Sequence, residues 1–315
     1  MNVIRRLEGI ARVSEGSVVT IGAFDGVHRG HHKVLQLVRE LADARGLDAA
    51  LVTFDRHPAQ VVRPNSAPRL LTSLDQKLEL LDATGLLDVC CVLTFDEARS
   101  RETAEEFVRE VLADRLQARV VVVGADFHFG YRRGGNVPLL ERMGADLGFE
   151  VVGLGLVSAE GAGGEPFSST RIRGLLDEGE VRAAAAALGR PHEVRGTVER
   201  GDERGRGLGF PTANVVVPSD TCMPADGIYA GTFTGADGVE RAAALSLGRR
   251  PTFYEHADAS MLEAHVLDFD GDLYDQPARI RFVERLRAEE RFETVEALVD
   301  QMRLDVEATR RVLGT

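Results

Sequence analysis

Histidines occupy a loop in which a phosphate-binding protein would normally carry a lysine. The stretch GAFDGVHRGHH, residues 22–32, follows the apolar run SVVTI and has the glycines and the strand-to-helix setting of a phosphate loop. His28 and His31, three residues apart, fall on one face of the opening helical turn. Imidazoles become cationic more readily beside an anion, so this pair can respond as charge accumulates on a phosphate during its displacement. Helix capping or simple surface exposure is the alternative explanation.

Hydroxyl and guanidinium groups gather at a second predicted helix start, SSTRIR, residues 168–173. Ser169 and Thr170 can cap backbone amides or bind a phosphate, and Arg173 presents a forked set of donors. Capping alone would also explain the Ser-Ser-Thr run.

The second half of the chain carries another set of residues suited to phosphate chemistry. In GRGLGFPTANV, residues 205–215, three glycines could admit phosphates to the backbone: Gly205, Gly207 and Gly209. Thr212 and Asn214 lie two residues apart, which in a strand places both side chains on one face. Their neutral oxygens suit the Mg²⁺ that nucleotide phosphates carry. A proline-initiated turn is the alternative for PTAN.

The elements around the histidines alternate between buried strands and amphipathic helices. Strands are expected at 17–24, 48–54, 89–95, 119–127 and 149–157, and helices at 34–46, 75–85, 104–116 and 138–148. This alternation predicts a doubly wound α/β domain, whose parallel sheet is covered on both faces and binds ligands beyond the carboxyl ends of its strands. GAFDGVH, TFDRHP and GADFHFG all fall at those ends.

The pattern changes near residue 190. A helix over 180–190 ends at Gly189 and Pro191, which marks a domain boundary. Beyond it, short β-rich segments at 193–200, 227–233, 241–247, 261–269 and 278–286 are separated by Gly, Asp and Pro turns. They predict an antiparallel sheet or small barrel, closed by a helix over 294–313.

Composition narrows the classes of function. The 315 residues are 44% hydrophobic, which indicates a globular protein of two domains. A net charge of −12 argues against nucleic-acid and anionic-membrane partners, so any phosphate site must be built locally. No apolar run spans a bilayer or forms a signal peptide, and the three cysteines have neither disulfide nor zinc spacing. We therefore expect a reduced, cytoplasmic setting, with the cysteines in the core.

The motifs carry a family resemblance. G-x-F-D-G-V-H-x-G-H resembles the HxGH signature of the nucleotidylyltransferases and is similar to the form found in bacterial FAD synthetases, as are TFDRHP, GADFHFGYRRGGN and SSTRIR in the same order. GRGLGFPTANV resembles the signature of riboflavin kinases, and MLEAHVLDFDGDLYD resembles their catalytic glutamate segment. Together they cover nearly the whole chain, which is similar to the bifunctional prokaryotic riboflavin kinase/FAD synthetase family.

The resemblance implies a division of labour. Residues 1–186 would form an FMN adenylyltransferase domain, and residues 187–315 a riboflavin kinase domain built on a mostly antiparallel barrel. With ATP and Mg²⁺, riboflavin would become FMN and FMN would become FAD. The adenylyl step uses the anionic phosphate of FMN as nucleophile, which needs charge neutralisation more than a base. The kinase step uses a neutral ribityl hydroxyl, which a carboxylate can help to deprotonate.

Residue roles follow from matching the motifs. Glu263 is the implied base of the kinase step, with Asp268 as the next carboxylate to test, and His28 and His31 are the implied catalytic pair of the adenylyl step. The remaining matched positions fall into three sets: nucleotide and phosphate contacts at Gly22, Phe24, Asp25, Gly26, Ser169, Thr170, Arg173, Gly205, Gly207 and Gly209; flavin contacts at Asp126, Phe127 and Phe129; and metal ligands at Thr212 and Asn214. Core packing is an equal alternative for each phenylalanine.

Two departures from the family pattern affect the kinase half. SLGRRPTF places Ser246 where the family has asparagine, and YEHADAS replaces a glycine-rich continuation. A regulatory paralogue that binds flavin or nucleotide with a weakened kinase is therefore the alternative to a working bifunctional enzyme. An adenylyltransferase for another phosphorylated metabolite is a third interpretation, but it leaves PTAN and Glu263 unexplained. Oligomeric state, including weak homo-oligomerisation, is left open.

Overall fold

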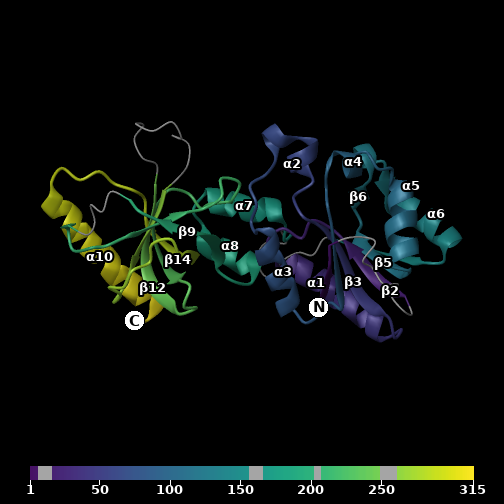
Figure 1. Ribbon diagram of the computed structural model, residues 1–315, viewed down its shortest axis with the longest axis horizontal. Helices are drawn as coiled ribbons and strands as arrows, with labels where there is room; N and C mark the ends of the chain where they lie inside the picture. Colours follow the sequence, from purple (N-terminus) through teal and green to yellow (C-terminus); the bar gives the residue numbers. More distant parts are fainter. Residues whose placement is uncertain (6–15, 156–165, 202–206, 249–260) are drawn as a thin grey trace. The chain divides into compact units, whose positions relative to one another are not determined.

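The computed structural model describes residues 1–5, 16–155, 166–201, 207–248 and 261–315 (Figure 1). Two compact units are formed, Met1–Ser169 and Thr170–Thr315. The first contains a parallel sheet and the second an antiparallel barrel, so both predicted architectures are confirmed.

The N-terminal sheet has six parallel strands in the order β1, β4, β3, β2, β5, β8. Their bounds are β1 Asn2–Ile4, β2 Ser17–Ile21, β3 Asp48–Phe54, β4 Val89–Leu93, β5 Ala118–Gly124 and β8 Glu150–Leu154. The sequence pattern found the last five and missed the edge strand β1, which is only three residues long and largely exposed. Because β2 lies inside the sheet, the loop that follows it emerges among the carboxyl ends of its neighbours.

Helices cover both faces of this sheet. On one face α1 (Arg29–Asp43) and α3 (Leu74–Ala83) pack on alternate strand residues that include Val18, Leu51 and Cys90. On the other, α5 (Ala104–Phe107), its wider-wound continuation η3 (Val108–Arg115) and α6 (Val137–Leu147) pack on residues that include Val19, Val52 and Cys91. Shorter elements in the connections are α2 Ala59–Val62, η2 Pro64–Ser66, α4 Glu97–Ser100, β6 His128–Phe129, η4 Tyr131–Arg133 and β7 Gly135–Asn136.

The C-terminal unit is a closed six-stranded antiparallel barrel in the order β10, β13, β12, β11, β14, β9. Its strands are β9 His192–Glu199, β10 Ala213–Val216, β11 Gly227–Thr234, β12 Glu240–Gly248, β13 Met261–Val266 and β14 Pro277–Arg287. Alternate residues such as Leu245, Leu262 and Ala264 point inward and are fully buried. The intervening residues, Glu263 among them, therefore lie on the outer face.

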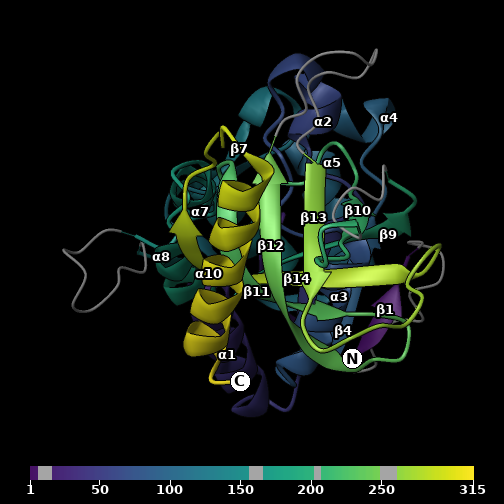
Figure 2. The same cartoon turned by 90° about the vertical axis from the view of Figure 1, so that its left-hand side faces the viewer.

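In the described residues of the later part of the chain, the helices are α7 (Ser169–Asp177), α8 (Val181–Leu188) and α10 (Val295–Leu313). The predicted end of α8 is confirmed, since Gly189 adopts the left-handed conformation (φ 82°) of a helix C-cap. Helix α10 packs across β11, β12 and β14 (Figure 2). The bidentate pair between Arg287 of β14 and the buried Asp305 of α10 (3.0 and 2.8 Å) fixes this packing.

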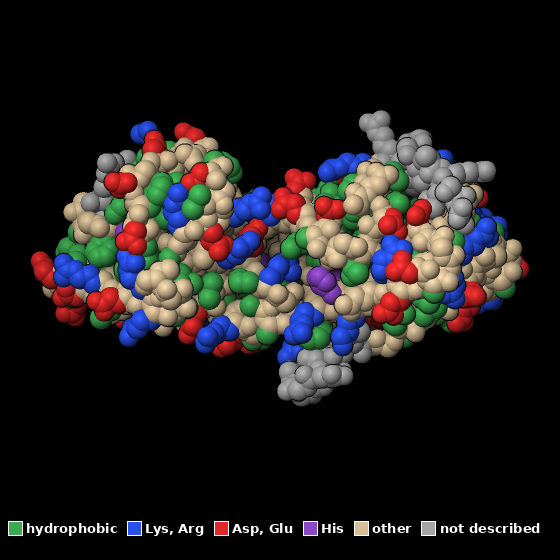
Figure 3. Space-filling model, turned by 90° about the horizontal axis from the view of Figure 1, so that it is seen from below, with side chains coloured by type: hydrophobic (Ala, Val, Ile, Leu, Met, Phe, Trp, Pro, Cys, Tyr) green, Lys and Arg blue, Asp and Glu red, His purple; other side chains and the backbone are tan. Residues whose placement is uncertain are grey.

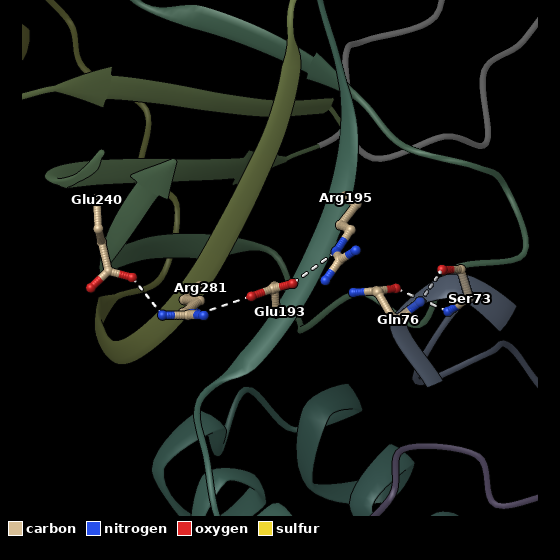
Figure 4. A network of polar contacts seen from close by, with 6 residues as sticks. All are labelled: Ser73, Gln76, Glu193, Arg195, Glu240 and Arg281. Carbon is tan, nitrogen blue, oxygen red and sulfur yellow. Dashed lines mark hydrogen bonds and ion pairs between the residues drawn. The ribbon is translucent and has the colours of Figure 1, made fainter. Parts of the chain in front are cut away.

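Charged side chains of both signs are interspersed over the face drawn in Figure 3. One group is organised into a chain of ion pairs on the barrel, running from Arg195 through Glu193 and Arg281 to Glu240 (Figure 4). Burial would raise the pKa of Glu193, but Arg195 and Arg281 together lower it. Among the described residues, no helix is both long and apolar enough to cross a membrane.

Candidate active sites

The histidine pair closes the start of α1. His28 is its N-cap, and its Nδ1 accepts from the His31 amide while Nδ1 of His31 accepts from the His28 amide, both at 3.3 Å. The two rings stack with centroids 3.6 Å apart, and Phe24 stacks on His31 at 4.4 Å. Gly30 leaves room for this arrangement, because a Cβ there would meet the His28 ring at 3.1 Å.

This geometry assigns different tasks to the two nitrogens of each ring. A nitrogen that accepts a hydrogen bond carries no proton, so each neutral ring holds its proton on Nε2. Nδ1 therefore orders the helix start and Nε2–H is the group that can donate to a phosphate. Helix capping and phosphate chemistry are thus compatible for the same residues, rather than alternatives.

Asp25 anchors the loop between β2 and α1. Its buried carboxylate accepts from the amides of Leu71 and Thr72 (3.0–3.1 Å) and from the Thr72 hydroxyl (3.2 Å), which in turn accepts from the Gly26 amide (3.1 Å). The backbone is held in unusual conformations, with positive φ at Phe24 (50°) and Val27 (38°). Gly22 also permits the bend, because a Cβ there would meet the Phe24 ring at 3.0 Å.

The sequence patterns missed Lys77, a buried residue of α3 that lies under this loop. Its Nζ donates to Ala23 O (3.2 Å), Thr53 Oγ1 (3.2 Å) and Phe54 O (2.8 Å). The signal that could have found it is compositional, since Lys33 and Lys77 are the only lysines among 38 basic residues.

A cavity of about 730 Å³ opens beside the loop, at the carboxyl ends of β2, β3, β4 and β5. Gly22, Ala23 and Phe54 contribute to its wall, and Phe127 and Phe129 stack there at 5.3 Å. Both phenylalanines are half-buried and also pack against the core, so packing and ligand contact coexist. Asp126 is exposed and lies outside the lining, with its carbonyl beside Nδ1 of His128 (2.8 Å).

Ser169 of the SSTRIR segment contacts the loop. Ser169 Oγ donates to the Asp25 carbonyl (2.9 Å), which ties the start of α7 to the phosphate loop. Thr170 is exposed and Arg173 is half-buried. The structure therefore gives Ser169 a position at this site.

A second group of candidates lies on the outer face of the barrel. Glu263 of β13 pairs directly with Asn214 of β10 on one side and with Ser246 of β12 on the other. Directly paired residues project to the same face, so the three side chains form one row. The residue that replaces the family's asparagine is thus the immediate neighbour of the matched glutamate.

Two cavities flank this row. One, of about 320 Å³, is bounded by Ser246, Glu263 and the α10 residues Leu298 and Met302; the other, of about 520 Å³, is bounded by Arg200, Asp272 and Tyr274. Thr212 lines both, and its hydroxyl lies 3.4 Å from Glu263 Oε2. Thr212 precedes β10 rather than lying within it, so the strand expected at Thr212 begins one residue later. A phosphoryl group could pass between the cavities at Thr212.

The glycine-rich stretch before Thr212 is only partly described. Gly205 lies outside the described residues, whereas Gly207 and Gly209 are exposed, with Gly209 at a φ of 86°. Leu208 and Phe210, which alternate with them, line the smaller cavity. Asn214 packs over Gly201, where a Cβ would meet its amide at 2.0 Å.

Carboxylates concentrate at the smaller cavity. Partial burial raises the pKa of Glu289, and the nearby Asp226 and Glu263 carboxylates raise it further, against the effect of Arg287. Asp268, the reserve carboxylate of the sequence prediction, is instead held by Arg310 in a bidentate pair (2.9 and 2.6 Å) and does not line the cavity. Glu289 is therefore the next carboxylate after Glu263.

Comparison with known proteins defines the class to which these two sites belong. Residues 10–171 match the family described as FAD synthetase, and residues 188–313 match the family described as riboflavin kinase. A crystal structure from Streptococcus pneumoniae, described as a macrolide-efflux protein, superposes with a TM-score of 0.85 at 28% identity, covering 98% of this chain and 99% of that one. The likeness supports the whole two-part fold.

Relatives of this chain combine both families, riboflavin kinase and FAD synthetase, in a single protein. The bifunctional riboflavin kinase/FMN adenylyltransferase of Escherichia coli K12 is 34% identical over 315 residues, covering 100% of this chain and 98% of the relative. That of Pseudomonas fluorescens is 36% identical over 310 residues, covering 98% and 97%. The chain therefore belongs to the bifunctional riboflavin kinase/FMN adenylyltransferase family, and the resemblance seen in its motifs is confirmed.

Proposed function

We propose that this chain phosphorylates riboflavin to FMN in its C-terminal part, residues 187–315, and adenylylates FMN to FAD in its N-terminal part, residues 1–186. ATP is the co-substrate of both reactions. The first releases ADP and the second releases pyrophosphate. The observation that carries the proposal is the presence, in one chain, of a histidine pair at a phosphate loop and a carboxylate beside a hydroxyl between two cavities.

In the kinase reaction, Glu263 accepts the proton of the ribityl hydroxyl as its oxygen attacks the γ-phosphorus of ATP and ADP departs. The smaller cavity, lined by Phe210 and Leu298, suits the apolar flavin ring, and the cavity beside Tyr274 suits the nucleotide. Thr212 borders both cavities, so the two substrates would meet next to Glu263.

The donors near Glu263 fit a magnesium ion carried by ATP. Thr212 supplies a hydroxyl and Asn214 an amide oxygen, both on the side of Glu263, and Mg²⁺ prefers such oxygen ligands while keeping several others from phosphates and water. Among the described residues no group of three or more His, Cys, Asp or Glu side chains could hold a metal by itself. We therefore propose Thr212 and Asn214 as ligands to nucleotide-borne Mg²⁺, which would neutralise phosphate charge.

In the adenylyl reaction, a phosphate oxygen of FMN attacks the α-phosphorus of ATP and pyrophosphate leaves. No base is required, because the nucleophile is already anionic. Nε2–H of His28 and of His31 would donate to phosphate oxygens whose charge grows in the transition state. Phe127 and Phe129 would contact the flavin, and Ser169, Thr170 and Arg173 would contact the phosphates of ATP.

Asp25 receives a different role from the one its motif suggests. We propose that it positions the loop rather than touching phosphate, since its oxygens already accept from Leu71 and Thr72. Gly22 and Gly26 would let the backbone approach the phosphates, while Phe24 holds the ring of His31. Gly207 and Gly209 would do the same for the kinase nucleotide, together with Gly205.

The regulatory alternative is not favoured, because the chain matches both enzyme families over nearly its whole length. The deciding experiment incubates the purified chain with riboflavin and Mg-ATP and separates the flavins by chromatography. Formation of FMN followed by FAD is expected. Flavin binding in equilibrium dialysis with no product would instead support the regulatory protein.

We further propose a reduced, cytoplasmic setting and the small-molecule partners riboflavin, FMN and ATP. Cys90, Cys91 and Cys222 are buried, and burial raises the pKa of Cys90 to about 12 and that of Cys91 to about 11, so neither of these two forms a thiolate at neutral pH.

A further inference from the structure

Lysine is almost excluded from this protein, yet one is kept in the interior. Of 38 basic residues, only Lys33 and Lys77 are lysines. Lys33 is exposed on α1, whereas the side chain of Lys77 reaches into the core beneath the phosphate loop with 7% of its surface exposed. Charged lysines are rarely buried unless their protons are paired, so the surroundings of Lys77 must supply acceptors.

The surroundings of Lys77 match an ammonium group. Ala23 O, Thr53 Oγ1 and Phe54 O lie 2.8 to 3.2 Å from Nζ, and an ammonium has three protons to donate. An arginine would bring five donors in a planar fork, which three acceptors around one point cannot satisfy. The contacts also use every proton of Nζ, so Lys77 has no donor left for a phosphate.

A single segment, residues 71–77, holds the phosphate loop through several contacts, and those of Lys77 are among them. Asp25 accepts from the amides of Leu71 and Thr72, and Gly26 donates to the Thr72 hydroxyl. The capping box of α3, in which Ser73 and Gln76 bond each other's amides, fixes the direction of this segment (Figure 4). Lys77 then joins the same helix to Ala23, inside the loop, and to Phe54, at the end of β3.

We propose that Lys77 is a positioning residue for adenylyl transfer, which holds Ala23 and Phe54 in the wall of the N-terminal cavity and places a positive charge behind the phosphate loop. The inference rests on the proposed adenylyl transfer at His28 and His31. The loop has no lysine of its own, and Lys77 of α3 supplies the positive charge instead. Its ammonium group orders the backbone of the loop and does not bind the nucleotide.

The titration of Lys77 gives this role a pH signature. Burial lowers the pKa of Lys77, an effect that the neighbouring Asp25, Cys90 and Asp55 oppose. A neutral amine has two protons, so deprotonation breaks at least one of the three contacts. FAD formation should therefore fall as pH rises through this lowered pKa. Protein stability should not fall with it, because in that range the unfolded chain binds the proton more tightly than the folded one.

The test compares Lys77→Met with Lys33→Met in the full chain. Methionine keeps the length of the side chain but removes its charge and its three contacts. We expect kcat for FAD formation from FMN to fall about 10- to 100-fold in Lys77→Met, with a smaller change in the KM of FMN, and to stay unchanged in Lys33→Met. Riboflavin phosphorylation should be unchanged in both. Full FAD formation by a folded Lys77→Met protein would overturn the proposal.

A second measurement covers the case in which Lys77→Met does not fold. Carbon-13 labelling of lysine in the unmodified protein gives two side-chain ε-carbon signals, with Lys33 as an internal control. The Lys77 signal should titrate at lower pH than that of Lys33 and should shift when α,β-methylene-ATP is added. Identical titrations with no response to the nucleotide would overturn the proposal, whereas an unmodified protein that makes no FAD from FMN would instead refute the proposed function.

Discussion

His28 and His31 show why a histidine pair can serve a phosphate loop. Nδ1 of each ring accepts a hydrogen bond from a backbone amide at the start of α1. In the neutral ring this places the proton on Nε2, which can then act as a donor. The stacking of Phe24, His31 and His28 then limits how far either ring can rotate. The sequence predicted both residues and their shared face, but not the reciprocal bonds, because these depend on ring rotamers that spacing does not specify.

Replacing His28 separates its two tasks. His28→Asn keeps a side chain that can cap α1 but removes the ring, whereas His28→Ala removes both. We expect each variant to lose about 100-fold in the rate of FAD formation from FMN, since a donor to the developing charge is gone. Only His28→Ala should also lose about 1 kcal/mol of unfolding free energy. Steady-state kinetics and thermal unfolding measure the two effects, and FMN formation from riboflavin is the control.

The result for His28→Asn is the decisive one. If that variant adenylylates FMN at the parent rate, His28 acts only as a helix cap.

Glu263→Gln isolates proton transfer in the kinase reaction, because glutamine keeps the size and hydrogen bonding of the side chain without its basicity. Riboflavin phosphorylation should fall at least about 100-fold, while adenylylation of supplied FMN stays near normal. Rates of FMN formation under single-turnover conditions measure this directly. A folded variant with the parent rate would direct attention to Glu289, which lines the same cavity.

At the scale of elements, the sequence predicted what periodicity can show. Five of the six parallel strands, the helices between them and most barrel strands were found, because buried strands and amphipathic helices leave clear apolar patterns. Strand β10 was expected only through the spacing of Thr212 and Asn214, and its start was placed one residue too early. The holding segment 71–77 was missed, since its partners are backbone and side-chain groups of residues distant in the sequence, which no local pattern encodes.

Helix α10 offers a prediction at this scale, because it forms one wall of the proposed flavin cavity and is held by Asp305. Asp305→Ala should reduce the unfolding free energy by about 3 kcal/mol, since Arg287 would keep a largely buried charge without its partner. The KM of riboflavin should rise by up to about tenfold, equivalent to about 1.4 kcal/mol, as the helix loosens. Denaturant unfolding and kinase kinetics provide the measurements.

Asp300→Ala is the matched control for this change. Asp300 pairs with Arg303 on the exposed face of the same helix, where an ion pair contributes little. Equal effects of the two substitutions would show that the Arg287–Asp305 pair does not hold α10.

The whole molecule consists of two units, and packing and the family matches place the boundary between them at different residues. Packing divides the chain after Ser169, whereas the family matches end at 171 and resume at 188, close to the boundary proposed at 186/187. The difference concerns α7 and α8. Leu176 of α7 accepts from the amide of Ala225, and α8 packs on β9 and β14, so these helices support the barrel without belonging to the kinase signature. The family matches thus delimit the residues that carry the two signatures, whereas packing also assigns to the second unit the helices that stabilise the barrel.

Fragments should show both boundaries. Residues 1–186 should adenylylate supplied FMN, because they contain the phosphate loop, its holding segment and Ser169. Residues 187–315 should phosphorylate riboflavin without making FAD.

The fragment of residues 187–315 lacks α7 and most of α8, so it exposes the barrel surface that these helices cover. Leu176 and Val181 are buried in the full chain, and burying such an apolar side chain contributes about 1.5–3 kcal/mol to the unfolding free energy. A fragment of residues 170–315 should therefore melt at least about 5 °C higher while turning over riboflavin at a similar rate. Calorimetry and flavin chromatography test both parts, with circular dichroism to verify folding. Fragments that are folded but inactive would mean that each reaction depends on the other half of the chain, and equal melting temperatures would mean that α7 and α8 contribute nothing to the barrel.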